Sequence, residues 1–222
     1  MEKVIVVLRA GTADDPWVDE LIGPVATELL GLGPTGLTLN VTDFSVRESL
    51  MTLTTLDPPA RGFVSLWVDQ HYGEQVRAAL DVLRPYCDHL AAYLVTESVP
   101  LRPPASPAGE RLPGLANVAL LRRPPHLDEA TWLARWLVEH TPVAIDTQST
   151  FGYLQNYVVR PLTPGAPRVS AIVEELFPIE AVHSVRAFFG ALDDTDLAER
   201  FSRMVASTAA FGANVDVDTV PT

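Results

Sequence analysis

The sequence contains little cysteine, few basic residues and no long apolar run. Cys87 is the only cysteine among 222 residues, so no intrachain disulfide can form, as is usual for a protein of the reducing cytoplasm. Acidic residues outnumber basic ones by 28 to 16, and the net charge of −12 argues against nucleic acid or a membrane surface as a partner. No stretch approaches the ~18 apolar residues of a membrane span, and the amino terminus lacks the features of a signal peptide. These absences predict a soluble, acidic protein of the cytoplasm.

Several motifs of metal and nucleophile chemistry are also missing. The five histidines form no His-x-His or His-Glu-x-x-His pattern, and there is no Gly-x-Ser-x-Gly turn. The segment GLGPTG at 31–36 matches G-x-G-x-x-G, but a helix is expected before it and a strand after it. A dinucleotide site needs the reverse order. We therefore expect neither a metal nor a cofactor.

A proline-rich segment divides the chain into two parts of similar length. Residues 101–114 have no apolar periodicity, which is typical of a linker. They separate residues 1–100 from residues 115–222. The chain is 47% hydrophobic and 20% charged, the ordinary balance of a globular protein with a substantial core. We predict a domain on each side of the linker.

The two parts resemble each other in sequence. "KVIVVLRA" at 3–10 is similar to "ANVALLRR" at 116–123, since both are apolar strands that end in Leu-Arg. "GPVATELL" at 23–30 and "TPVAIDTQ" at 141–148 share Pro-Val-Ala in what is expected to be the first helix of each part. A diverged tandem repeat explains both similarities.

Each repeat is expected to have the element order strand, helix, strand, strand, helix, strand. We expect strands near 3–9, 36–44, 63–69 and 90–97, and again near 116–123, 151–160, 168–176 and 209–217. Helices are expected near 16–31 and 72–84, and again near 128–146, 179–190 and 194–207. This is the order of the ferredoxin-like βαββαβ unit, an antiparallel sheet with helices on one side. The predicted fold is therefore α+β, with two such units packed sheet to sheet as an internal pseudo-dimer.

The stretch TWLARWLVEH contains the first candidate site residues. Trp132, Trp136 and His140 are four residues apart, which places them along one stripe of a helix. Such a stripe is either ordinary core or the wall of a pocket. At the matching positions the first half has Ile22 for the histidine and Val18 for the second tryptophan. Since an aliphatic face suffices there, the pocket interpretation is favoured.

The strands that follow add further polar groups. In FGYLQNYVV, alternation places Tyr153 and Gln155 on one face and Asn156 on the other. Either the first pair or Asn156 faces the helix with the histidine. On the next strand, Glu175 shares an apolar face with Phe177. This glutamate either orients the histidine or ends the strand and reaches water.

The second half resembles the EthD family of the dimeric α/β-barrel superfamily. The resemblance rests on "LLRRPPHLD", "RWLVEHTPVA", "YLQN" and "VEELF". It implies a pocket between sheet and helices, with His140 and Trp136 at family positions and Tyr153, Gln155 and Asn156 on the Y-x-Q-N strand. Related proteins include cofactor-free cyclases, decarboxylases, dehydratases and monooxygenases, and tandem relatives include haem proteins.

Together these features predict a cofactor-independent lyase or cyclase acting on a hydrophobic aromatic or polyketide-like carbonyl compound. His140 would transfer the proton and Tyr153 would stabilise the developing oxyanion. The predicted substrate-binding residues are Trp132, Trp136, Gln155, Asn156, Glu175 and Phe177. The alternatives are a binding protein for an apolar small molecule and a cofactor-free or haem-dependent oxidoreductase, with His140 or His183 as the axial ligand. A homodimer of the pseudo-dimeric chain is also possible.

Overall fold

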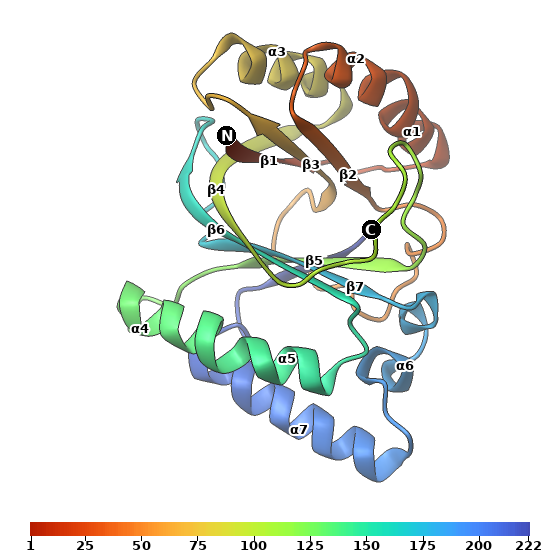
Figure 1. Ribbon diagram of the computed structural model, residues 1–222, viewed down its shortest axis with the longest axis vertical. Coiled ribbons are helices and arrows are strands. Elements are labelled where there is room, and N and C mark those ends of the chain that lie inside the picture. The colour runs from red at the N-terminus through yellow and green to blue at the C-terminus, as the bar shows by residue number, and fades with distance from the viewer.

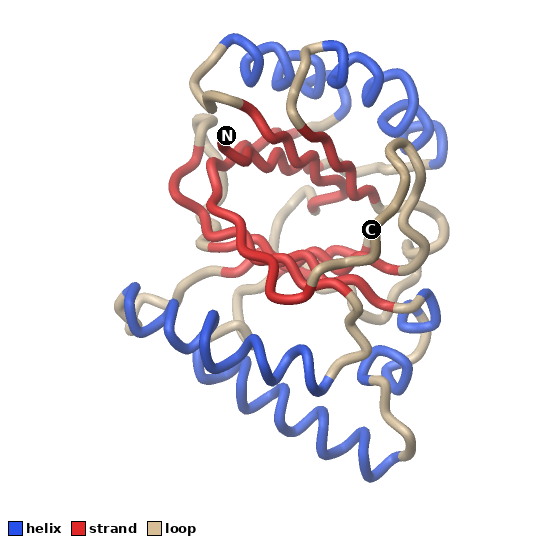
Figure 2. The backbone as a smooth tube through the Cα atoms, viewed as in Figure 1, coloured by secondary structure: helices blue, strands red, loops and turns tan.

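The computed structural model describes all residues, Met1–Thr222, and contains one antiparallel eight-stranded sheet. The sheet curls on itself, and helices cover its outer face at two opposite sides (Figure 1, Figure 2). The strands are β1 (Glu2–Arg9), β2 (Gly36–Val41), β3 (Ala60–Val68), β4 (His89–Leu101), β5 (Leu115–Leu121), β6 (Gly152–Pro161), β7 (Ala171–Phe177) and β8 (Asp218–Pro221). Their order in the sheet is β2-β3-β1-β4-β6-β7-β5-β8.

This strand order is that of two ferredoxin-like units side by side. The first unit contributes β2-β3-β1-β4 and the second β6-β7-β5-β8, so each unit has its strands in the order 2-3-1-4. The units join where β4 pairs with β6, for example Val95 with Val158. On the other side, Leu53 forms an isolated bridge with Thr219 of β8. The predicted α+β fold of two tandem repeats is confirmed.

The helices are α1 (Asp15–Glu20), α2 (Ala26–Gly31), α3 (Glu74–Leu83), α4 (Glu129–Leu133), α5 (Thr141–Thr147), α6 (Val185–Phe189) and α7 (Asp194–Phe211). The π-helical segment Leu21–Val25 joins α1 to α2, and a second one, Ala134–His140, joins α4 to α5. None of the helices is both long and apolar enough to cross a bilayer. Residues 102–114 contain no helix or strand, and the exact domain boundaries stay a prediction.

One expected element is wrong. The last strand, expected near 209–217, lies at Asp218–Pro221, because α7 continues to Phe211. The helix ends at Gly212, whose φ of 83° is the left-handed conformation that glycine adopts readily at a helix end. The alternating residues after this glycine form a turn, and the strand starts only beyond them.

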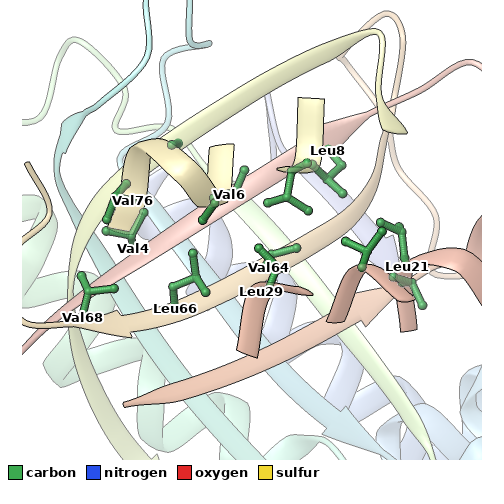
Figure 3. Close-up of a cluster of buried hydrophobic side chains, with 14 of the residues drawn as sticks. Val4, Val6, Leu8, Leu21, Leu29, Val64, Leu66, Val68 and Val76 are labelled. Carbon is green, nitrogen blue, oxygen red and sulfur yellow. The ribbon is translucent and has the colours of Figure 1, made fainter. Parts of the chain in front are cut away.

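Three layers of apolar side chains hold the structure together. Aliphatic side chains fill the space between the first unit's sheet and α1 to α3, among them Val4, Leu21 and Leu66 (Figure 3). The inside of the curled sheet holds a second cluster that draws on both units, for example Ile5 and Ile172. A third layer, under α4, α5 and α7, contains the aromatic residues described below.

Candidate functional site

The alternation of β6 decides which residues face the helices of the second unit. Tyr153 is buried in the layer that contains Trp132 and Trp136, so its face of the strand is turned to the helices. Gln155 has the same parity and bonds to the helix that covers this face. Asn156 points into the curled sheet, where its side-chain N–H donates to Glu174 Oε1 over 3.1 Å. Of the two alternatives, the structure therefore favours Tyr153 and Gln155.

Three polar residues form a row across the helix-covered face of this unit. Tyr153 on β6 is directly opposite Glu175 on β7, and Glu175 is directly opposite Asn117 on β5. Their exposed fractions are 1%, 9% and 4%, respectively. We call Asn117, Glu175 and Tyr153 the polar row. Directly opposite residues on one face have Cβ atoms about 5 Å apart, so the row is one continuous group.

Burial controls the ionisation of Glu175. It raises the pKa of this carboxyl from 4.5 to about 8, because no charged side chain lies near enough to stabilise the anion. Glu175 is therefore mostly neutral at pH 7, and it can give up or accept a proton close to neutral pH. A carboxyl in this state is suited to general acid–base chemistry.

The phenol of Tyr153 is neutral across the physiological range. Burial, and next the charge of Glu175, raise its pKa well above 10. Gln155 and the Trp136 indole face the hydroxyl and act in the opposite direction. A neutral phenol beside a proton-exchanging carboxyl can donate a hydrogen bond to an oxygen that gains negative charge.

Two polar atoms in this layer are buried without a hydrogen-bond partner. They are Trp136 Nε1, a donor, and Asn117 Oδ1, an acceptor. Native proteins satisfy nearly all buried polar groups, so each exception requires an explanation.

His140 is placed differently from the expectation. Ala134–His140 is a π-helical segment, in which residues five apart lie one above the other. Thr141 therefore lies above Trp136, and its hydroxyl donates to the Trp136 carbonyl over 3.2 Å. Thr141 also accepts from the Gln155 amide over 2.7 Å, so it is the threonine that contacts the sheet. The histidine is turned toward α7, as its contacts show.

His140 contacts α7. Its Nδ1 is 2.9 Å from Ser207 Oγ, and its ring centroid is 4.7 Å from that of Phe211. Burial lowers the pKa of His140 to about 4, so the ring is neutral at pH 7. The structure does not bring His140 into hydrogen-bond contact with Tyr153 or Gln155.

The remaining predicted residues are part of the packing around the row. The indole centroids of Trp132 and Trp136 are 5.0 Å apart, and the Trp132 N–H donates to the Phe211 carbonyl over 3.1 Å. Phe177 stacks on Phe188 with 4.3 Å between the ring centroids, in a neighbouring apolar cluster.

Sequence reasoning missed two polar residues of the site. Asn117 is the only polar residue in the strand "LANVALL", and this was a signal that could have been used. Gln148 follows α5, and its amide N–H can donate to Glu175 Oε1 over 3.0 Å. Nothing in the sequence around Gln148 points to this contact, since the two residues are far apart in the chain.

The residues present do not fit a haem group. His140 is buried in contact with α7, and Trp132 and Trp136 occupy the layer between helices and sheet. His183 is exposed and follows a short 3-10 turn. No three His, Cys, Asp or Glu side chains form a group that could hold a metal ion.

Comparison with known proteins supports the fold. No protein-family model matches the sequence, and no curated protein matches it. A solved structure of a monooxygenase candidate from Fusobacterium nucleatum has a TM-score of 0.54 at 8% identity, over 99% of this chain and 90% of that one. An anthrone oxidase-like protein has a TM-score of 0.53 at 9% identity, with coverage of 99% and 90%. The chain thus has the dimeric α/β-barrel fold, with both units in one polypeptide.

Proposed function

We propose that this protein is a cofactor-independent enzyme that transfers a proton to or from a small, hydrophobic carbonyl compound at the polar row. The observation that carries the proposal is the buried Glu175 carboxyl, which lies between Tyr153 and Asn117 without a charged partner. A fold alone does not require such a group, and perturbed carboxyls of this kind are typical of reaction sites.

In this proposal Glu175 takes the acid–base role that the sequence suggested for His140. Above its pKa of about 8 the carboxylate removes a proton next to the substrate carbonyl, and below it the acid returns one. Tyr153 and the Trp136 N–H, which faces the Tyr153 hydroxyl without a well-formed hydrogen bond, donate to the carbonyl oxygen as negative charge develops there. Asn117 Oδ1 accepts from a hydroxyl of the substrate.

The surroundings of the row favour an uncharged substrate. No arginine or lysine side chain bonds to any member of the row or to Trp136. A carboxylate or phosphate buried there would therefore be unpaired, which is strongly unfavourable. The aromatic residues Trp132 and Trp136 suit a flat hydrophobic skeleton, in keeping with an aromatic or polyketide-like compound.

We further propose an oxidoreductase of monooxygenase type ahead of a lyase. Both solved structures cited above carry names of oxidising enzymes. A methylene activated by proton removal would react with dioxygen, so that CH₂ and O₂ give a carbonyl and water. A lyase would release carbon dioxide or water from the same carbanion instead. We also propose that the second unit is related to the EthD family, on the sequence resemblance described above.

The test uses a hydroxylated anthrone as probe, with an oxygen electrode and mass spectrometry of the product. The proposal expects oxygen uptake that Glu175→Gln abolishes and that Glu199→Gln, an exposed carboxylate on α7, leaves unchanged. Product formation without oxygen uptake would replace the oxidoreductase by the lyase. Stoichiometric binding of the probe without any turnover would overturn the enzyme proposal in favour of a binding protein.

A further inference from the structure

Gln148 is fixed at the carboxyl end of α5, next to the polar row. Its backbone N–H donates to the Ala144 carbonyl over 3.1 Å, which holds the residue to the last turn of the helix. The next residue is held as well, since Ser149 donates its N–H to the Phe188 carbonyl over 2.9 Å and its hydroxyl to the Ala187 carbonyl over 2.6 Å. The side chain of Gln148 therefore starts from a backbone that α5 and α6 both restrain.

The orientation of the Gln148 amide follows from its neighbours. The end of the side chain faces two acceptors, Glu175 Oε1 at 3.0 Å and the Ala144 carbonyl at 3.1 Å. An amide nitrogen can donate to both, whereas an amide oxygen could donate to neither. With the nitrogen in this place, Gln148 is the only residue that hydrogen-bonds the Glu175 carboxyl.

We infer that Gln148 is a positioning residue that determines which oxygen of Glu175 exchanges the proton. Because the amide N–H only donates, it favours a lone pair on Oε1, so the proton of the neutral acid is on Oε2. Oε2 has no protein partner and is the oxygen that meets the substrate. The catalytic role of Gln148 rests on the proposed function, but its hydrogen bond to Glu175 can be tested without a substrate.

The surroundings of Glu175 make the effect of Gln148 measurable. Tyr153 on β6 is the only titratable group that interacts with the carboxyl, and Asn117 on β5 and Gln148 after α5 are neutral. A hydrogen bond to the ionised form lowers a carboxyl pKa. Burial alone places the pKa of this carboxyl at about 8, and the amide hydrogen bond acts against that rise, so removing the amide should raise the pKa.

The experiment is a carbon-13 NMR titration of the Glu175 carboxyl, assigned by its loss in Glu175→Gln. In Gln148→Leu, the midpoint is expected to move upward by about one pH unit. The matched control is Gln75→Leu, which removes an amide that donates over 2.9 Å to Leu32 O, at the end of α2 in the first unit. Both variants should lower the melting temperature, and only Gln148→Leu should shift the titration.

The outcomes separate this inference from the proposed function. A titration that does not move in Gln148→Leu, while stability falls, would overturn the positioning role and leave only packing. A shifted titration in a protein that turns over no probe would support the inference and count against the enzyme. If Gln148→Leu does not fold, Gln148→Asn provides the same test, since its shorter amide cannot reach Oε1.

Discussion

The two units of this chain have the same fold and very different helix-covered faces. At the place of the polar row, the first unit has Leu37, Leu66 and Val4, which are directly opposite one another in the same strand order. The neighbouring rows are Leu39, Val64 and Val6 in the first unit and Gln155, Val173 and Ala119 in the second. The first unit therefore shows that aliphatic side chains are sufficient for this fold, and the polar groups of the second need another explanation.

The covering helices differ as well. Each unit has a π-helical segment in its first helix, at Leu21–Val25 and at Ala134–His140. Ile22, which matches His140 in the repeat, is 42% exposed, whereas His140 is 7% exposed. The histidine is buried because α7 covers it. Its burial thus reflects packing against α7, whereas the polar row and Gln155 distinguish the sheet itself.

The largest expected effect is on turnover. Glu175→Gln keeps the shape of the side chain and removes its exchangeable proton, so kcat/KM for the probe should fall by about 10² to 10⁴-fold. Leu66→Met, at the matching position of the first unit, should change kcat/KM little. Steady-state kinetics of both variants measure the difference, and equal effects would show that the units do not differ in function.

The next effect is on the pH dependence of stability. The pKa of Glu175 is raised from 4.5 to about 8 in the folded protein, so between these values the unfolded chain binds fewer protons than the folded one. The contribution of Glu175 to stability should consequently fall as pH rises through this window, by about 4 kcal/mol. Glu175→Leu should remove this dependence. Urea unfolding of the original protein and of Glu175→Leu at about pH 5 and about pH 9 measures this dependence. The same change in free energy of unfolding between the two pH values in both proteins would refute the raised pKa.

Trp136→Phe tests the unpaired indole N–H. Phenylalanine keeps one aromatic ring but lacks the donor, so affinity for the probe should fall about tenfold while stability falls by about 1 kcal/mol. The control is Trp17→Phe in the first unit, whose indole donates to the Tyr86 carbonyl over 2.7 Å. That variant should lose stability and keep its affinity. Calorimetric titration and thermal melts distinguish the two, and unchanged affinity in Trp136→Phe would remove the indole from the site.

The smallest effect is expected for His140. His140→Gln can keep a hydrogen bond to Ser207, so turnover should change by less than about threefold and stability by about 1 kcal/mol. Steady-state kinetics and thermal melts of His140→Gln measure both effects. A loss comparable to that of Glu175→Gln would restore His140 as the base and contradict the role given to the polar row.

The sequence predicted the fold well because the repeat and the alternation of strands are local patterns. The sequence left open whether Tyr153 and Gln155 or Asn156 face the helix and whether Glu175 reaches water, and the structure places Tyr153, Glu175 and Trp136 together under the helices. The orientation of His140 could not be predicted, because a π-helical segment is not visible in residue spacing. The contact of Gln148 with Glu175 depends on how α5 ends above the sheet, which is a tertiary feature.

The central claim is that the polar row is present for chemistry and is not required by the fold. The most direct test replaces it with its counterpart from the first unit, through Tyr153→Leu, Glu175→Leu and Asn117→Val in one protein. We predict a folded chain whose free energy of unfolding at about pH 8 is at least that of the original, with no proton-transfer activity. A chain that fails to fold, or is less stable by more than about 2 kcal/mol, would contradict the claim.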